Sequence, residues 1–409
     1  MAIGDIIVGI DIGTSKVSAV IGEVNSFNQI EIICMVNNKC NGVKKSKIIN
    51  EEEVIRAVAK TIKEAEDESN LKINSAYATI PGKYVTIVQN SILKEVRDKY
   101  SGISLKDIGA SIMQVRDIEV PEGKTLIDIV PEKFILESGK VLADPVGALT
   151  SSFTLQAQVL LAEKEYIKQL TGIFKKVGIE VDGFVPNTLA ERNLVLDINE
   201  LNDNIMLLDI GAGNTDIGVF EGQSFVYTNT IPVGGNNITN DIALVLNISE
   251  EEADKLKRQY GLALKSFIDN DNDIILNTCK SEGTKKIIKS SELIEIIEAR
   301  IEEIFSLVNK DITNKGIKNR INNVVLTGQG ISNISKSDVA GKIILNIPVK
   351  ISTGRLISTI KPVYRSSYAL VRYIAARPFA KTVSSSIDAR KEENFLKNVI
   401  GKVKDFFYS

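Results

Sequence analysis

One motif occurs twice in this chain, each time in the same local setting. A short apolar run, Ile6–Ile10, leads into Asp11-Ile-Gly, and a second apolar run, Val17–Ile21, follows a polar turn. The same order returns further on, where the strand-like segment 205–208 leads into Asp209-Ile-Gly and another apolar run begins at Ile217. An apolar run, a glycine-containing turn and a returning apolar run predict a β-hairpin. Because the whole arrangement is repeated, the sequence predicts two related α/β domains.

The segments between the hairpins show helical and strand-like patterns. Apolar residues recur at helical spacing in 51–68, 105–114, 164–176, around 189–196, 249–260 and 290–309. A stretch from about Val85 to Leu161 has its own strands, one helix and three prolines, and is typical of a small inserted domain. The segment Asn323–Gly330 reads as a strand followed by a glycine turn, an arrangement usual at a nucleotide crevice.

The turns of the two hairpins contain the residues that a phosphate site requires. Backbone N–H groups of Gly13, Thr14 and Ser15 can converge on an anion, because glycine lets the backbone approach closely. The hydroxyls of Thr14 and Ser15 add donors, and Lys16 adds positive charge. The second turn would hold the terminal phosphates from the opposite wall with Gly211, Gly213, Asn214 and Thr215.

An aspartate precedes each turn. Asp11 and Asp209, facing each other across a cleft, suit Mg²⁺ held largely through water. A single Asp-x-Gly is compatible with a purely structural tight turn, but two copies at the same point of a duplicated hairpin favour a binding site.

Composition excludes several classes of function. The 409 residues include no histidine, which excludes Ser-His-Asp and Cys-His catalysis and imidazole zinc sites. The three cysteines have no metal-binding spacing and fit a reducing cytosol. A formal net charge of −2 predicts no nucleic-acid binding. No run approaches the ~18 apolar residues that span a bilayer.

The C-terminal segment is amphipathic. On a helix its apolar residues fall within an arc of roughly 140°, and they are Phe395, Leu396, Val399, Ile400, Val403, Phe406 and Phe407. The opposite face includes Lys397, Lys402 and Lys404. Because a polar segment with proline and serines precedes it, a membrane anchor lying in the plane of the bilayer is one interpretation, and a helix docked on the protein is the other.

The hairpin motifs, with Leu326-Thr-Gly-Gln-Gly330, resemble the phosphate and adenosine motifs of the actin/hexokinase superfamily. Within it, the segments 231–243 and 252–261 are similar to the FtsA family of bacterial division actins, as are Ile103–Asp107, 129–134 and 144–147 in the insert. The resemblance runs nearly from end to end. It implies an actin-like fold of two duplicated α/β domains around a nucleotide cleft, with an inserted 1C-type subdomain and a C-terminal amphipathic helix.

The resemblance also implies a domain division and further site residues. The division is 1–84 with 166–200 (subdomain 1A), 85–165 (1C), 201–240 with 320–377 (2A), 241–319 (2B), a linker at 378–391 and a membrane-targeting helix at 392–409. The residues near the nucleotide would be Gly234, Gly235, Asn236, Asp254, Lys257, Gly328, Gln329 and Gly330. Gln329 stands where a second consecutive glycine is common, and Asp254 replaces a usual glutamate. Neither Pro186 nor Asn187 can act as a base where relatives often carry an acidic residue, so we expect slow ATP hydrolysis at most.

By the same resemblance, the chain is expected to bind ATP and Mg²⁺, to polymerise, and to tether FtsZ to the inner face of the cytoplasmic membrane at the division site. Partners would be the FtsZ C-terminal peptide, further copies of itself, an anionic membrane surface and other divisome proteins. Arg300 would pair with carboxylates of the FtsZ peptide, or alternatively with Glu303 on its own helix. The alternatives are a PilM-like pilus-assembly actin homologue and a small-molecule kinase of the same superfamily. The kinase is the less favoured, since no sugar-kinase-like signature is present.

Overall fold

The computed structural model describes residues 4–27, 29–98, 100–277, 285–352 and 360–377, and the chain forms two compact units. The larger unit, here called the body, contains residues 4–86 and Glu165–Ala375. The smaller, here called the inserted unit, contains Ile87–Lys164 and residues 376–377. The predicted linker 378–391 and the predicted helix 392–409 lie outside the described residues.

The first sheet of the body is built around the first predicted hairpin. Its strands follow the order β11-β6-β1-β2-β3, with bounds β11 (Glu180–Pro186), β6 (Ser75–Ile80), β1 (Ile6–Ile12), β2 (Lys16–Val24) and β3 (Ile30–Lys39). β1 and β2 are antiparallel and pair from Ile6 with Glu23 to Ile12 with Val17. β6 joins β1 in parallel, so the carboxyl ends of β1 and β6 meet at the edge where the hairpin turns.

The second sheet repeats this topology. Its order is β14-β13-β12-β17-β18, with bounds β14 (Ser224–Ile231), β13 (Thr215–Glu221), β12 (Asn204–Ile210), β17 (Asn323–Thr327) and β18 (Val349–Ile351). β12 pairs antiparallel with β13 and parallel with β17, as β1 does with β2 and β6. The predicted duplication is therefore confirmed at the level of strand order.

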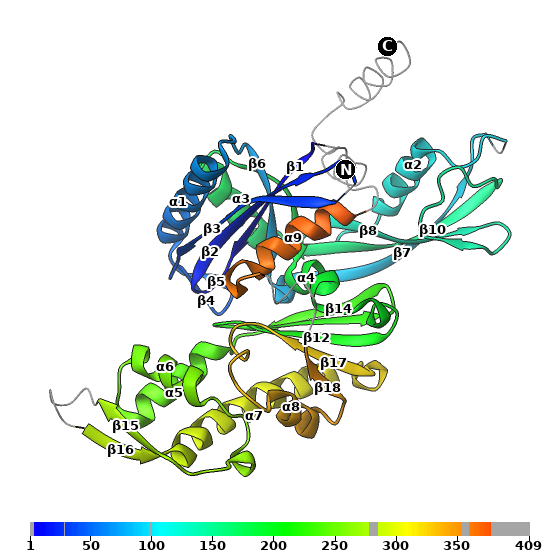
Figure 1. The fold of residues 1–409 in the computed structure, drawn as a ribbon. Helices are drawn as coiled ribbons and strands as arrows, with labels where there is room; N and C mark the ends of the chain where they lie inside the picture. The colour runs from blue at the N-terminus through cyan, green and yellow to red at the C-terminus, as the bar shows by residue number, and fades with distance from the viewer. Residues whose placement is uncertain (1–3, 28, 99, 278–284, 353–359, 378–409) are drawn as a thin grey trace. The chain divides into compact units, whose positions relative to one another are not determined.

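Helices of the body cover both sheets (Figure 1). They are α1 (Glu51–Ser69), α3 (Lys164–Lys176), α4 (Asn187–Val195), α5 (Gly235–Leu246), α6 (Glu250–Tyr260), α7 (Ser290–Asn314), α8 (Ser337–Leu345) and α9 (Arg365–Ala376). The sequence predicted the bounds of α1, α3, α4 and α6 to within three residues, whereas α5, α8 and α9 were not predicted. α1, for example, begins where the Asn50 side chain accepts a hydrogen bond from the Glu53 amide at 3.1 Å. α7 runs five residues beyond its predicted end at Asn309.

Short elements complete the body. They are β4 (Val43–Lys44), β5 (Lys47–Ile48), β15 (Asp273–Asn277), β16 (Lys285–Lys289), η1 (Gly82–Tyr84), η2 (Ile198–Glu200), η3 (Lys265–Phe267), η4 (Lys318–Arg320) and η6 (Pro362–Tyr364). β4 pairs with β5, and β15 pairs with β16.

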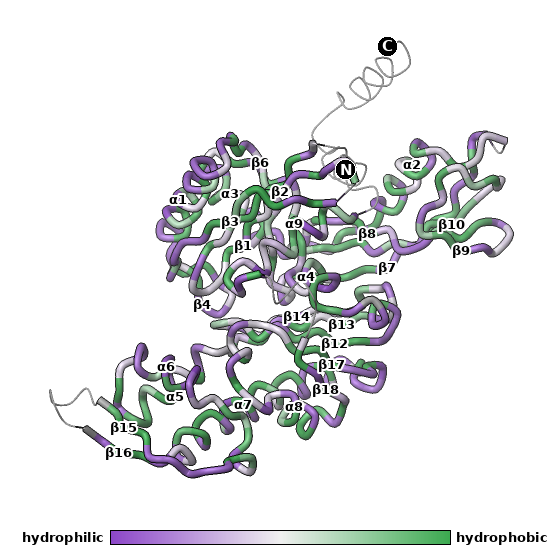
Figure 2. The backbone as a smooth tube through the Cα atoms, in the orientation of Figure 1, coloured by the Kyte–Doolittle hydropathy of each residue, from purple (hydrophilic) through white to green (hydrophobic). Residues whose placement is uncertain are grey.

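The hydrophobic cores lie along the central strands. Figure 2 shows hydrophobic residues concentrated on strands of both sheets, with hydrophilic residues on helix surfaces such as that of α1. The strand residues of β12 from Ile205 to Leu208 are all fully buried, because helices cover the sheet and its strands are apolar on both faces. On the first sheet, α9 packs closely enough that a Cβ on Gly9 would lie 2.8 Å from the Ser367 carbonyl oxygen.

The inserted unit is a separate α/β layer. Its sheet has the order β7-β10-β8-β9, with bounds β7 (Val85–Glu95), β10 (Ser152–Glu163), β8 (Lys124–Leu136) and β9 (Val141–Leu142), and its helix is α2 (Leu105–Arg116). Ile108, Ile112, Phe134 and Phe153 are among the buried residues of its own core. A unit with its own core explains why this stretch reads as an insert in the sequence.

In the described part of the chain, no helix combines the length and the apolar character needed for a bilayer crossing.

Candidate functional site

The two hairpin turns of the body contact each other. The Gly13 amide closes the first turn on the Lys16 carbonyl at 2.9 Å, and the Gly211 amide closes the second on the Asn214 carbonyl at 2.8 Å. The Asn214 amide nitrogen donates to the Thr14 hydroxyl at 3.2 Å, which joins the turns directly. Side chains far apart in the sequence therefore meet at one place, as the repeat predicted.

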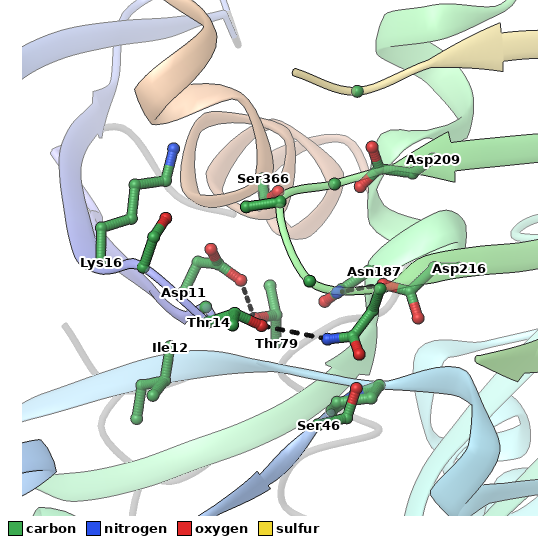
Figure 3. Close-up of a pocket in the computed structure, with 18 of the residues that line it drawn as sticks. Asp11, Ile12, Thr14, Lys16, Ser46, Thr79, Asn187, Asp209, Asp216 and Ser366 are labelled. Carbon is green, nitrogen blue, oxygen red and sulfur yellow. Dashed lines mark hydrogen bonds between the residues drawn. The ribbon is translucent and has the colours of Figure 1, made fainter. Parts of the chain in front are cut away.

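A cavity of about 110 Å³ opens at this junction (Figure 3). It contains most of the residues predicted from the turns, namely Asp11, Gly13, Thr14, Ser15, Lys16, Asp209, Gly211, Gly213 and Asn214, together with Gly328 and Gln329. It also contains residues that the sequence analysis did not assign to the site, among them Ser46, Thr79, Glu191, Asp216 and Arg365. These side chains come from the β4–β5 turn, β6, α4, β13 and α9, so only the tertiary fold brings them together.

The two aspartates end β1 and β12 on the cavity wall. Asp11 is buried and accepts a hydrogen bond from the Thr79 hydroxyl at 2.6 Å. Burial raises the pKa of Asp11, and the Thr79 hydroxyl and the Lys16 charge offset part of that rise. Burial likewise raises the pKa of Asp209, which the Arg365 charge partly offsets. Each carboxylate therefore gains from a cation placed beside it.

The charge around the cavity is unbalanced. Asp11, Asp209, Asp216 and Glu191 contribute four carboxyl groups, whereas Lys16 and Arg365 contribute two cations among the lining residues described. Burial lowers the pKa of Lys16, and burial raises that of Glu191 well above its ordinary value. A highly charged anion entering alone would meet this acidic wall, so the site favours an anion accompanied by a divalent cation.

Asp216 is the most fully bonded of the site residues that sequence reasoning missed. The Thr230 hydroxyl donates to one of its oxygens, and the Asn187 side-chain amide donates to the other at 2.9 Å. Burial nevertheless raises the pKa of Asp216 to about 7. The residue stands inside the second motif, but neither spacing nor residue type distinguishes an aspartate that faces a cavity from one that faces solvent.

Ser46 reaches the cavity from the β4–β5 turn. Lys45 and Ser46 have φ of 52° and 56°, a left-handed conformation that costs a non-glycine residue about 1 kcal/mol. Ser46 is 2% exposed. Local sequence does not indicate this position, because three lysines within four residues, at 44, 45 and 47, usually mark a solvated loop.

Tyr166 of α3 forms another part of the wall. It lines the cavity and also a wider surface groove on its other side. Its ring stacks on Tyr84 of η1 with centroids 3.7 Å apart.

Glycines predicted near the nucleotide pack the second turn. The Gly235 and Asn236 amides donate to the carbonyls of Gly211 and Ala212 at 2.9 and 2.7 Å. A Cβ on Gly330 would lie 2.3 Å from the Gly211 carbonyl oxygen. These glycines therefore allow backbone to touch backbone behind the turn.

A second cavity, of about 470 Å³, adjoins the first. It shares Ser15, Ala212 and Gln329 with the first cavity and is also lined by Gly235, Asn236, Asp254, Lys257 and Gly330. A third cavity, of about 270 Å³, shares Asp254, Lys257, Gln329 and Gly330. The exposed side chain of Gln329 thus stands at the junction of all three.

Lys257 is held by the protein itself. Its ammonium group donates to the Thr239 hydroxyl at 2.7 Å and to the Gly235 carbonyl at 3.2 Å, and it pairs with Asp254 at 2.9 Å. Although burial acts to raise the pKa of Asp254, its bonds to Lys257 and Arg258 hold that pKa below the ordinary value. Lys257 therefore links α6 to α5 through contacts within the protein alone.

Two predicted residues lie behind the cavity walls. The Thr215 hydroxyl is buried and donates to the Val233 carbonyl at 2.8 Å. Gly234 packs against the second turn, where a Cβ would lie 2.6 Å from the Gly211 carbonyl oxygen. Neither residue is among those lining the three cavities.

Arg300 on α7 already has acidic partners. Its guanidinium binds both carboxylate oxygens of Asp241 on α5, at 2.6 and 2.9 Å, and it also pairs with Glu303. The alternative contact with Glu303 is therefore present. The contact with Asp241 was not predicted, because the two residues are on different helices.

The cavity fits a magnesium nucleotide by its donors and acceptors. Thr14, Ser15, Ala212 and Gly213 have amides with no acceptor in the described part of the chain, as a phosphate cradle requires. Buried oxygens of Asn187 and Asn214 lack donors there, as a hydrated cation requires. Asp11 and Asp209 are two carboxylates and Mg²⁺ takes six ligands, so an ion beside them would keep several waters.

Two copies of one five-stranded sheet, each with its hairpin turn facing a shared cavity, define an actin-like fold. Solved structures agree: a chain of the PilM-PilN type IV pilus biogenesis complex has a TM-score of 0.57 and 15% identity, over 91% of this chain and 99% of that one. MreB5 of Spiroplasma citri, in a crystal structure bound to ADP, has a TM-score of 0.52 and 15% identity, over 91% and 97% of the two chains. The predicted fold class is confirmed.

Sequence comparisons narrow this class to one family. The family model described as cell division protein FtsA matches residues 206–370, and that of the SHS2 domain inserted in FtsA matches 82–161. FtsA of Buchnera aphidicola is 30% identical over 367 residues, which are 85% of this chain and 83% of that protein. FtsA of Bacillus subtilis is 27% identical over 369 residues, 90% and 83% of the two chains. The chain belongs to the FtsA family of cell-division proteins.

Proposed function

We propose that this chain binds ATP with Mg²⁺ between the two halves of the body, each half being built on one of the two five-stranded sheets. The observation that carries the proposal is the convergence of both hairpin turns on one cavity, in a chain of the FtsA family. The phosphates would lie against the turns, and the nucleoside would lie in the adjoining cavity. The proposed contacts are Asp11, Gly13, Thr14, Ser15, Lys16, Asp209, Gly211, Gly213, Asn214, Gly235, Asn236, Asp254, Lys257, Gly328, Gln329 and Gly330.

Hydrolysis is proposed to be slow. Asn187 offers an amide rather than a carboxylate, and Asp216, which Asn187 contacts, has a pKa raised by burial to about 7. The Asn187 amide cannot take up a proton from an attacking water, so the proposal of slow hydrolysis rests on Asn187; a carboxyl group with a pKa near neutral pH, as at Asp216, is by itself suited to general-base action. ATP would act mainly by stabilising one arrangement of the two halves, and that arrangement would set the contacts between copies in a polymer.

The chain is further proposed to tether FtsZ filaments to the inner face of the cytoplasmic membrane at the division site. Family membership supports this role, and so does the amphipathic pattern of 392–409, with an apolar face containing Phe406 and Phe407. Burying such a face in the bilayer interface gives reversible binding, which polymerisation would strengthen by multivalency.

α7 is the proposed site for the FtsZ C-terminal peptide. Arg300 is bound at two points by Asp241 but at one point by Glu303, whose side chain is 48% exposed. A carboxylate of the peptide would therefore replace Glu303 as the second partner, while Asp241 keeps the guanidinium in place.

Co-sedimentation with anionic liposomes tests the tether. The protein, with Mg-ATP, should pellet with the lipid and carry a labelled FtsZ C-terminal peptide with it. Phe406→Glu combined with Phe407→Glu should leave the protein in the supernatant. Phe27→Glu is the matched control, because Phe27 is 80% exposed in the body and should not affect pelleting. Pelleting of the double variant at the wild-type level would contradict membrane binding through this segment.

A further inference from the structure

The tip of the β4–β5 hairpin has an uncommon conformation at the cavity wall. Its two turn residues, Lys45 and Ser46, both have positive φ although neither is glycine. The Lys45 side chain points to solvent, whereas Ser46 is buried and lines the cavity. Figure 3 shows the Ser46 hydroxyl directed toward the side of the cavity where Thr14 and Asn187 lie.

The backbone of this tip is fixed by η1. The Tyr84 hydroxyl donates to the Ser46 carbonyl at 2.7 Å, and the Lys83 ammonium donates to the Lys45 carbonyl at 2.7 Å. η1 is itself held to the second sheet, because the Lys83 amide donates to the Thr230 hydroxyl at 3.2 Å. The position of Ser46 is therefore set by bonds to its backbone, and its side chain contributes none of them.

The Ser46 hydroxyl is buried and has no hydrogen-bond partner among the described residues. A buried hydroxyl without a partner is unfavourable, and serines with a left-handed backbone are uncommon. Two unfavourable features at one residue on a cavity wall indicate a partner that comes from the cavity.

The identity of that partner follows from where Ser46 stands. Ser46 lines the cavity formed by the two turns, but it lines neither of the cavities that contain Asp254 and Lys257. A nucleotide bound as proposed above would have its nucleoside in those outer cavities. Ser46 is then at the opposite end, beyond the turns that hold the inner phosphates.

We propose that the Ser46 hydroxyl donates a hydrogen bond to the terminal phosphate of a bound nucleoside triphosphate, and that this contact distinguishes the triphosphate from the diphosphate. The inference rests on the proposed nucleotide site and adds a specificity residue to it. A neutral donor is suited to this place. It binds the phosphate without repelling the cation that the surrounding carboxylates attract.

The test separates the hydroxyl from the backbone strain. Ser46→Ala removes only the hydroxyl, whereas Ser46→Gly removes the hydroxyl and also suits the positive φ. Lys45→Gly is the matched control, because it relieves the same strain one residue earlier and Lys45 is not among the residues that line the cavity. Binding of Mg-AMP-PNP and of Mg-ADP is measured by isothermal titration calorimetry, after thermal unfolding has established that each variant is folded.

Both Ser46 variants should weaken AMP-PNP binding about tenfold and ADP binding less than about twofold, as expected for one hydrogen bond to a charged group. Lys45→Gly should change neither. Equal weakening of both nucleotides, unchanged affinities, or the same ratio change in Lys45→Gly would overturn the inference. If the wild-type chain binds neither nucleotide, the proposed function falls as well. If it binds both and the ratio does not respond to Ser46, only the role of Ser46 falls.

Discussion

The two hairpin turns share a motif and a place in their sheets, yet they serve different purposes. At the first turn, a Cβ on Gly13 would meet nothing closer than 3.4 Å, and Thr14, Ser15 and Lys16 line the cavity with their side chains. At the second turn, a Cβ on Gly213 would lie 2.6 Å from Thr14. Both turns present backbone amides to the cavity, but the first adds two hydroxyls and a lysine, whereas the second is closely packed against its neighbours.

The difference follows from what lies behind each turn. The start of α5 and the glycines after β17 pack on the second turn. Amides of α5 bond the carbonyls of the turn, and the Gly330 amide bonds the Ile210 carbonyl at the end of β12. The duplicated sheets have kept their strand order while their turns have diverged. Repetition in a sequence therefore predicts topology better than it predicts the role of each copy.

The largest expected effect is on the packing behind the second turn. In Gly330→Ala the new Cβ would lie 2.3 Å from the Gly211 carbonyl oxygen, an atom of the backbone that cannot move aside. We expect a loss of about 3 kcal/mol or more and a fall in Tm of about 6 °C or more. Gly13→Ala should cost less than about 1 kcal/mol. Thermal unfolding of both variants measures the contrast, and equal Tm values would mean that the turns do not differ.

The next prediction compares Lys16, which lines the cavity, with Lys257, whose ammonium group is already bound by protein groups. Lys16→Met removes a cation from an acidic cavity, and we expect Mg-ATP affinity to fall about tenfold or more while Tm changes little. Lys257→Met breaks bonds to Thr239, Gly235 and Asp254, so its main effect should be a lower Tm. Calorimetric titration and thermal unfolding measure both. The reverse pattern would contradict the assignment.

A smaller effect concerns the pH dependence of stability, and it depends on Asp216 in β13 of the second sheet. Burial raises the folded-state pKa of Asp216 to about 7 from an ordinary value of 3.8. Between those values the unfolded chain has lost the proton that the folded chain keeps, so stability falls as pH rises. The Tm of the ligand-free protein should fall from about pH 5 to about pH 8, and Asp216→Asn should reduce the fall.

Asp11, Asp209 and Glu191 contribute to this pH dependence with the same sign, because burial raises the pKa of each. Asp216→Asn should therefore remove only part of it. Asp203→Asn is the control: the Asn322 amide lowers the pKa of Asp203, so this group titrates below the range scanned. A pH profile that Asp216→Asn leaves unchanged would show that this carboxyl group does not carry the effect.

The smallest expected effect is at Gln329, where the three cavities meet. Gln329→Gly removes an exposed side chain without relieving any backbone strain, because φ is not positive there. We expect Mg-ATP to bind up to about threefold more tightly, since less side-chain freedom is lost on binding. Weaker binding, measured by the same titration, would show instead that the glutamine amide contacts the nucleotide.

Local signals in the sequence were sufficient for the hairpins and for the bounds of α1, α2, α3, α4 and α6, but not for α5, α8 and α9. Asp-Ile-Gly marks a turn, and a capping residue such as Asn50 marks a helix start, so neighbouring residues carry this information. The cavity also contains Thr79, Glu191 and Arg365, whose convergence depends on the fold. Thr215 and Gly234 lie within the predicted motifs but behind the cavity wall. Thr215 begins β13, and side chains alternate between the two faces of a β-strand. Gly234 packs against the backbone of the second turn.

The stack of Tyr84 on Tyr166 gives the site an optical property. The chain contains 10 tyrosines, 13 weakly emitting phenylalanines and no tryptophan, so phenol rings dominate its near-ultraviolet emission. Tyr166 lines the cavity, and its ring centroid lies 3.7 Å from that of Tyr84. Ligand entry that shifts this ring would change the emission without any attached dye. Tyr166→Trp would place the only indole of the chain on the cavity wall, where its fluorescence would follow occupancy in real time.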